Sequence, residues 1–190
     1  MKFVTTFLLG ALFLCMSNGI RAQSTFYRGA DLSFVQQLEN NGAVFKDNGT
    51  QMDILEIFKN HSLNIVCLRL WYHPQDGYND LSHTLAMARR IKALGGKLLL
   101  DFHYSDTWAD SGHQTKPAAW QNLSYSVLKD SVYQYTKRVL TALKDQNTIP
   151  SIVQIGNEVT SGMLWNTGRV GGSYDNSTQW HSLTDYSIPE

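Results

Sequence analysis

The fold class is decided by the stretch from Ser151 to Glu158, which reads SIVQIGNE. Its apolar, β-branched residues are typical of a parallel strand that is covered on both faces, and Gly156 lets the backbone open before the polar pair Asn157-Glu158. In α/β barrels the chemistry lies at the carboxyl ends of the strands, so Glu158 is a candidate catalytic acid. The alternative is that Glu158 only caps the helix that follows it.

Four strand-like runs alternate with three helix-like stretches, which is the pattern of consecutive βα units around a parallel sheet. The predicted strands are Phe26–Asp31, Asn64–Trp71, Lys97–His103 and Ser151–Asn157. The predicted helices are Thr50–Lys59, Leu81–Leu94 and a third whose apolar stripe is Leu128, Val132, Tyr135, Val139 and Leu143. We expect this stripe to face the core, because its members recur at helical spacing.

Helix starts are indicated by short polar residues. Thr50 and Asp53 are placed like a capping box for the first predicted helix, and Ser124 or Ser126 is a candidate cap for the third. The second helix is expected to end at Gly95-Gly96.

The first 22 residues have the three-part layout of a secretory signal peptide: Met1-Lys2, an apolar run, and small or polar residues up to Ala22. We predict cleavage after Ala22 and a protein that is secreted, periplasmic or held at the cell surface. A lipid anchor at Cys15 is the alternative, although Leu14 precedes it where a small residue is expected. The apolar run is shorter than the roughly 20 residues that span a bilayer, and no later stretch approaches that length, so no transmembrane segment is predicted.

Charge and cysteine content narrow the function classes. Loss of residues 1–22 would remove Lys2 and Arg21 but no acidic residue, which leaves a slightly acidic chain. A nucleic-acid partner is not expected, because it would require a clustered basic face. Cys67 would be the one cysteine left, so stability must come from a packed core rather than from an intramolecular disulfide.

Aromatic and polar side chains follow three of the predicted strands, as a sugar-binding site requires. Sugars offer apolar ring faces and a rim of hydroxyl groups, which aromatic plates and short polar groups recognise. The candidates are Trp71, Tyr72, His73, His103, Tyr104, Asp106, Trp108, Asp110, His113, Trp165, Asn166 and Arg169. The segment 104–122, which also holds Trp120, is long for a βα connection and is expected to be functional. Core packing is the alternative for each tryptophan taken alone.

Two charged positions lie inside the predicted strands. Arg69 interrupts an apolar run, so we expect a carboxylate partner, either a catalytic acid that it orients or a structural ion pair. Asp101 and His103 lie two residues apart and share a face, as metal ligands could. That spacing supports a rival hypothesis, a metal-dependent barrel hydrolase, although no further histidine follows the fourth strand at a ligand-like position.

Five stretches carry a family resemblance: GAD at 29–31, RLW at 69–71, DFHYSDTWAD at 101–110, KP at 116–117 and QIGNE at 154–158. From about Tyr27 to about Leu183, the chain resembles glycoside hydrolase family 53, the arabinogalactan endo-β-1,4-galactanases. The motif at 101–110 is long and specific, whereas Asn157-Glu158 is shared across the family's clan. The resemblance implies a (β/α)8 TIM barrel with catalytic glutamates after strands four and seven.

The resemblance also implies site roles and a substrate. Glu158 would be the general acid/base, Asn157 would contact the sugar's 2-hydroxyl group, and Arg69 would support the nucleophile. In a retaining mechanism one carboxyl group attacks the anomeric carbon while the other, about 5 Å away, protonates the leaving oxygen. Trp71, His103, Asp106 and Trp108 would line the cleft, and Trp165 is added from its place beyond Glu158. The expected substrate is β-1,4-galactan or arabinogalactan, a pectin side chain, with no cofactor and no metal.

The chain departs from the family pattern in its length. About 168 residues follow the predicted leader, whereas a complete barrel takes roughly 250. We therefore expect residues 23–190 to form the N-terminal half of a barrel, truncated to about the first four βα units and without the nucleophile. Gln179–Thr184 resembles the family's fourth helix, but residues 185–190 do not continue its apolar pattern. An exposed half-barrel edge predicts self-association, and a non-catalytic galactan-binding half barrel is the alternative function.

Overall fold

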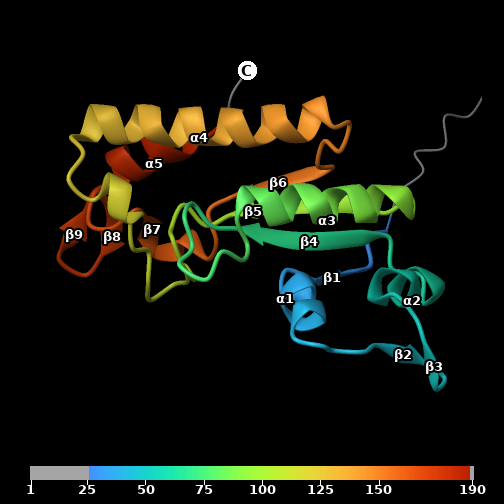
Figure 1. Ribbon diagram of the computed structural model, residues 1–190. Helices are drawn as coiled ribbons and strands as arrows, with labels where there is room; N and C mark the ends of the chain where they lie inside the picture. Colours follow the sequence, from blue (N-terminus) through green and yellow to red (C-terminus); the bar gives the residue numbers. More distant parts are fainter. Residues whose placement is uncertain (1–25, 189–190) are drawn as a thin grey trace, which may run out of the picture.

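The structure, a computed structural model, describes residues 26–188. A parallel sheet with the strand order β1-β4-β5-β6 forms its centre (Figure 1). The strands are β1 (Gly29–Asp31), β4 (Ile65–Leu70), β5 (Lys97–Phe102) and β6 (Ile152–Ile155). All four were predicted, and each is shorter than its predicted range. The predicted signal peptide lies outside the described residues.

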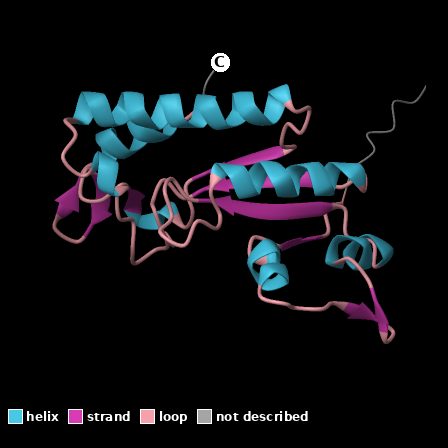
Figure 2. Ribbon diagram, viewed as in Figure 1, coloured by secondary structure: helices cyan, strands magenta, loops and turns pink. Residues whose placement is uncertain are grey.

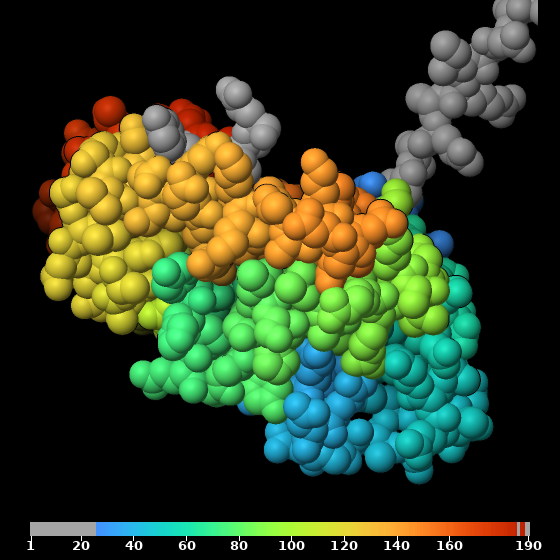
Figure 3. All heavy atoms as spheres, turned by 45° about the horizontal axis from the view of Figure 1, so that its top comes forward, coloured from blue at the N-terminus to red at the C-terminus, as the bar shows by residue number. Residues whose placement is uncertain are grey.

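Five α-helices accompany the sheet: α1 (Val35–Asn40), α2 (Ile54–Asn60), α3 (Leu81–Ala93), α4 (Tyr125–Asp145) and α5 (Ser177–Tyr186). Helix α3 contacts β4, β5 and α4, and α4 also contacts α5. Much of the face drawn in Figure 3 is formed by α3, in green, and α4, in yellow to orange. Among residues 26–188, no helix is both long and apolar enough to cross a membrane.

The central strands place alternate side chains on two different faces, because successive residues of a strand point to opposite sides. The hydrophobic core takes Leu68 and Leu70 from β4, Leu100 and Phe102 from β5, and Ile155 from β6. The predicted stripe of α4 is buried in the same core, as expected. The alternate residues, which include Arg69 and Asp101, therefore lie on the opposite, polar face of the sheet. This arrangement fits part of a (β/α) barrel, with the helices outside and the polar face inside.

Two small antiparallel sheets were not predicted (Figure 2). One is the hairpin of β2 (Lys46–Asp47) and β3 (Thr50–Gln51), and the other joins β7 (Gly162–Met163), β8 (Gly168–Gly171) and β9 (Tyr174–Asp175). Strands of two to four residues carry too little alternation to be recognised in a sequence.

The capping predictions were partly wrong. Thr50 pairs in the hairpin rather than opening α2, and Asp53 caps the helix by itself, because its carboxylate accepts the N–H of Leu55 at 2.7 Å. Ser124 is the N-cap residue of α4, but its side chain makes no capping hydrogen bond. The hydroxyl groups of Ser124 and Ser126 instead lie 3.3 Å apart.

Trp120 belongs to the core, which corrects its assignment to a functional loop. It lies in a short 3-10 helix, η1 (Ala118–Trp120), and is 3% exposed. Its ring packs against those of Tyr72 and Tyr135, with centroids 4.7 and 6.0 Å away. Trp120 thus packs the end of the long segment 104–122 against α4. The earlier residues of this segment form the edge of the site.

Candidate functional site

The candidate site lies at the carboxyl ends of the four parallel strands, which share one edge of the sheet. Arg69 lies near the end of β4, His103 directly follows β5, and Asn157-Glu158 follow β6. The long connection between β5 and α4 and the loops around β7–β9 gather beside this edge (Figure 1). Active sites of α/β barrels occupy the same edge.

Arg69 is 4% exposed and has the expected carboxylate partner. Its Nη2 lies 3.3 Å from an oxygen of Asp31, at the end of β1. Its guanidinium group also lies over two aromatic rings, 4.2 Å from the centroid of Phe34 and 4.4 Å from that of Trp108. Nε and Nη1 are buried without a hydrogen-bond partner among the described residues. Because an unpaired buried donor is costly, these two groups point to an acceptor that a ligand or a further carboxylate would supply.

His103 connects the strand ends through a fixed tautomer. Its Nδ1 accepts hydrogen bonds from the indole N–H of Trp71 at 3.3 Å and from the backbone N–H of Ala109 at 3.0 Å. Both partners can only donate, so the ring proton of neutral His103 must be on Nε2. Nε2 lies 3.5 Å from a carboxylate oxygen of Asp101.

This tautomer bears on the metal hypothesis, because the Nδ1 lone pair of His103 accepts two hydrogen bonds and Nε2 carries the proton, so neither ring nitrogen offers a free lone pair to a metal ion. Among residues 26–188, no group of three or more His, Cys, Asp or Glu side chains is arranged to hold a metal ion. The shared face of Asp101 and His103 is therefore explained by their contact with each other.

Asp106 braces two loops at the edge of the site. One carboxylate oxygen accepts the backbone N–H of His73 at 3.0 Å, and the other accepts that of Ala118 at 2.8 Å. Asp106 and Trp71 also line an open hollow of about 500 Å³, together with Gln75, Asp76 and Thr107. Trp71 is largely buried and Trp108 is 43% exposed, so Trp108 is the more accessible of these two aromatic plates.

Glu158 occupies an unusual backbone conformation after β6. Its φ is +47°, in the left-handed region, and Gly156, two residues earlier, has a φ of +80°. The Glu158 side chain is exposed, and its Oε2 accepts the backbone N–H of Ser111 at 3.3 Å. Glu158 precedes the short 3-10 helix η2 (Val159–Ser161) but makes no side-chain capping bond to it, which removes the support for a pure capping role.

Asn157 is fastened to the loop that follows β5. Its Nδ2 donates to the carbonyl of Ala109 at 2.7 Å, and its Oδ1 lies 3.4 Å from Nε2 of Gln154. One of the two N–H groups on Nδ2 is therefore used within the protein, and the second N–H and the amide oxygen can each make a further hydrogen bond.

Trp165 lines a second hollow, of about 420 Å³, on the β7–β9 side of Glu158. The hollow includes Ser111, whose N–H contacts Glu158, and Ser161, whose carbonyl accepts the Trp165 indole N–H at 2.9 Å. The guanidinium group of Arg169 lies 4.0 Å from the Trp165 ring centroid and 4.5 Å from that of Tyr174. The edge of the sheet thus carries two hollows with Glu158 beside one of them.

Burial and hydrogen bonding shift several pKa values near this edge, among them those of Cys67 and Asp110. Burial raises the pKa of Cys67 from 9.0 to about 12, and the carboxylates of Asp31 and Asp101 add to the effect. The pKa of Asp110 is lowered, first by the backbone N–H of Gly112 and then by the ring of His113. The exposed His113, another predicted candidate, is held by Asp110 at 2.9 Å.

Sequence analysis missed several residues of this edge. Phe34 covers Arg69, Ser111 contacts Glu158, and Gln114 binds the carbonyl of Asn157 at 2.7 Å. Each contact joins segments far apart in the sequence, and no local pattern marks them. Asp31, quoted for the family resemblance, was not expected to be the partner of Arg69.

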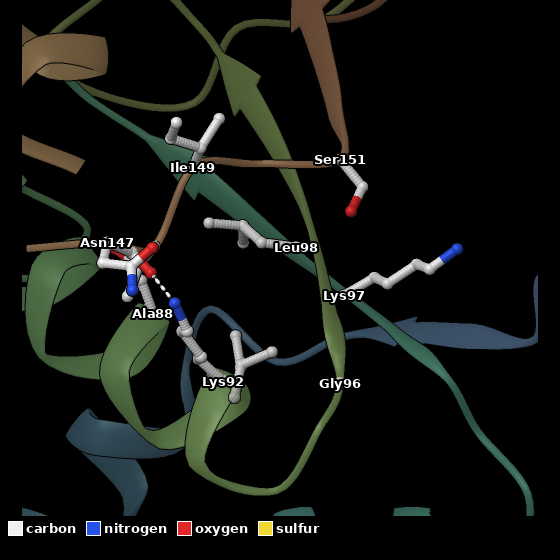
Figure 4. A pocket seen from close by; sticks show the side chains of 10 residues that line it. Ala88, Lys92, Gly96, Lys97, Leu98, Asn147, Ile149 and Ser151 are labelled. Atoms are coloured by element: carbon white, nitrogen blue, oxygen red, sulfur yellow. Dashed lines mark hydrogen bonds between the residues drawn. The ribbon is translucent and has the colours of Figure 1, made fainter. Parts of the chain in front are cut away.

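A further pocket, of about 240 Å³, lies at the opposite edge of the sheet (Figure 4). It is lined by Lys97 and Leu98 at the start of β5 and by Ser151 just before β6. The ammonium group of Lys92 is bonded to the carbonyl of Asn147. This pocket is separated from Glu158 by the length of the strands, so it is not part of the candidate site.

Comparison with known proteins identifies a consistent set of relatives. The sequence model of the family described as "Glycosyl hydrolase family 53" matches residues 27–187. The chain is 42% identical over 148 residues to an arabinogalactan endo-β-1,4-galactanase of Thermothelomyces thermophilus, covering 75% of this chain and 43% of that protein. It is 40% identical over 151 residues to an endo-β-1,4-galactanase of Bacillus subtilis, covering 75% of this chain and 35% of that protein.

Solved structures give the same result. A structure from a study of two fungal β-1,4-galactanases superimposes with a TM-score of 0.80 at 38% identity, covering 85% of this chain and 47% of that one. A family 53 catalytic domain from Ignisphaera aggregans gives a TM-score of 0.79 at 38% identity, with coverages of 85% and 46%. The chain spans about half the length of the curated relatives it matches.

Proposed function

Because this chain belongs to glycosyl hydrolase family 53, we propose that it forms the acid/base half of an endo-β-1,4-galactanase that cleaves β-1,4-galactan or arabinogalactan. The observation that carries the proposal is the placement of Asn157-Glu158 beside Ser111 and Trp165, at the strand edge that also holds Arg69 and Trp108. Exposed aromatic plates and a carboxylate at the carboxyl ends of barrel strands are what hydrolysis of a sugar polymer requires.

Three polar residues at this edge have tasks in the proposed retaining mechanism. Glu158 would protonate the leaving oxygen and then activate water, and its exposed carboxyl group is accessible for both steps. Asn157 would meet the sugar's 2-hydroxyl group through its side-chain amide, which the bond from Nδ2 to Ala109 holds in place. Arg69 would direct its unpartnered Nε and Nη1 toward the nucleophilic carboxylate.

The nucleophile is missing from this half of the site, because residues 26–188 contain no strand that corresponds to the one that carries it in the family. In the family pattern it follows a seventh strand, and the described sheet has four strands. We propose that hydrolysis needs a carboxylate from outside the described residues, held about 5 Å from Glu158.

The test is the release of reducing ends from β-1,4-galactan, by the chain alone and by the chain joined to the carboxyl-terminal half of the Bacillus subtilis relative. Glu158→Gln should lower turnover by about 10²- to 10⁴-fold, the usual contribution of general acid–base catalysis. Glu56→Gln, on the exposed surface of α2, is the matched control and should leave turnover unchanged. Equal turnover of Glu158→Gln and the unchanged protein would contradict the assignment.

A galactan-binding protein without hydrolysis is the second candidate function. It is favoured by one observation: Trp71, Trp108 and Trp165 line the edge using residues of this chain alone. Galactan affinity in the 190-residue chain, together with no cleavage in either form of the assay, would establish this alternative.

Export and self-association are further parts of the proposal. Residues 1–22 support secretion or delivery to the periplasm or cell surface, where pectin side chains would be met, and sequencing of the mature amino terminus should begin at Gln23. The two outer strands of the sheet, β1 and β6, each pair on one side only among the described residues. The backbone edge of β6 that stays unpaired within residues 26–188 favours pairing with a second copy. A purely monomeric chain in sedimentation would contradict self-association.

A further inference from the structure

Gln114 is a buried amide at the meeting point of three loops. It is 2% exposed, and its Nε2 donates to the carbonyl of Asp110 at 2.9 Å and to the carbonyl of Asn157 at 2.7 Å. Its own backbone carbonyl accepts the N–H of Trp165 at 2.7 Å. A buried amide with these bonds ties the loop after β5 to the end of β6 and to the segment before β8.

Two further hydrogen bonds complete this connection between residues 109–114 and residues 157–158. Nδ2 of Asn157 donates to the carbonyl of Ala109 at 2.7 Å, and the N–H of Ser111 donates to Oε2 of Glu158 at 3.3 Å. The carboxylate of Asp110 holds the turn between them, because it accepts the N–H of Gly112 at 2.7 Å. The loop therefore reaches the carboxylate of Glu158 in a defined orientation.

Glu158 needs such support because its backbone is strained. A glutamate with a φ of +47° occupies the left-handed region of backbone conformation, which residues other than glycine rarely adopt. Strained residues persist only where the surrounding structure fixes them. The Asn157 carbonyl, which belongs to the peptide group directly before Glu158, is the acceptor that Gln114 holds.

We propose that Gln114 is a positioning residue for Glu158: it holds the peptide group before Glu158 and the Ser111 N–H that contacts the carboxylate. The inference rests on the proposed acid/base function of Glu158. Gln114 is buried beneath the loop, so it acts through Asn157 and Ser111 and not on the substrate.

The experiment follows the amide resonance of Ser111 in the ¹⁵N-labelled 190-residue chain as the pH is changed. Asp110 and His113 are ionisable groups close to Ser111 and can also change its resonance. The part of the shift that disappears in Glu158→Gln is therefore taken as the Glu158 component. Gln114→Met keeps the length of the side chain and removes both N–H donors. Gln121→Met, at an exposed position of the same connection, is the matched control.

We expect the Glu158 component of the Ser111 shift to fall at least twofold in Gln114→Met and to stay unchanged in Gln121→Met, while amides of α4 keep their positions. Full retention of that component in Gln114→Met would overturn the inference. If Gln114→Met does not fold, Gln114→Leu, which also lacks both N–H donors, is compared with Gln121→Leu, and full retention of the Glu158 component would again overturn the inference. Failure of the proposed function would show separately, as galactan turnover that Glu158→Gln leaves unchanged.

Discussion

The hydroxyl group of Tyr135 should stabilise both the core and the candidate site. Tyr135 is 3% exposed on α4, and its hydroxyl donates to the backbone carbonyl of Trp71 at 3.0 Å. Burial raises its pKa well above the ordinary value of 10, so the hydroxyl keeps its proton and remains a donor at any pH at which the protein is studied. Tyr135→Phe removes the donor and leaves the Trp71 carbonyl buried and unpaired. A buried acceptor without a partner costs about 1–3 kcal/mol of the free energy of unfolding.

Urea unfolding followed by tryptophan fluorescence measures this loss. With a denaturant slope of roughly 2 kcal/mol per molar, the midpoint should fall by about 1 M. Tyr125→Phe is the matched control, because Tyr125 is 37% exposed at the start of α4, and it should change the free energy by less than about 0.5 kcal/mol. Equal urea midpoints for the two variants would show that the hydrogen bond from Tyr135 to the Trp71 carbonyl does not stabilise the fold.

Three further predictions concern side chains near the site. Because the pKa of Cys67 is raised to about 12, peptide mapping at pH 8 should show its alkylation at least tenfold slower in the folded chain than in urea; equal rates would contradict the raised pKa. The lowered pKa of Asp110 means that its contribution to stability is complete above its usual value of 3.8 and is lost as the pH falls through the lower native value. The destabilisation caused by Asp110→Asn should therefore shrink from pH 6 toward pH 2, and a constant difference would disprove the linkage. Asp106→Asn places an amide where a carboxylate accepts two backbone N–H groups. Urea unfolding should show that the free energy of unfolding falls by about 1 kcal/mol. An unchanged free energy of unfolding would exclude the bracing role.

The sequence predicted the barrel units because their patterns are long and local. Strands β4 and β5 are apolar runs bounded by polar residues, and α4 repeats an apolar stripe over 16 residues, from Leu128 to Leu143. The hairpin β2–β3 and the sheet β7–β9 are too short to show a period. The capping box failed because Thr50 pairs with Asp47 across the hairpin, a contact that no helix-start pattern includes.

The sequence named candidate residues for the site but not the contacts between them. Chemistry alone requires a partner for Arg69, yet the identity of that partner, Asp31, depends on the pairing of β1 with β4. The roles proposed for Glu158, Asn157 and Trp165 remain predictions that the geometry supports. Asp106 was expected to line the substrate cleft, which stays a prediction, and in the structure it lines a hollow and braces two loops. The position of Gln114 beneath Asn157 follows from tertiary packing and has no sequence signal.

The most direct test of the account is a titration of the ¹⁵N-labelled chain with β-1,4-galactotetraose, followed by NMR. We predict that the shifted resonances will include the indole N–H of Trp108 and Trp165 and the amide of Ser111 beside Glu158, while Lys92 and Asn147 in the pocket of Figure 4 stay unchanged. Shifts confined to that opposite pocket, or none at saturating sugar, would contradict the claim that the carboxyl ends of the four strands form a galactan site.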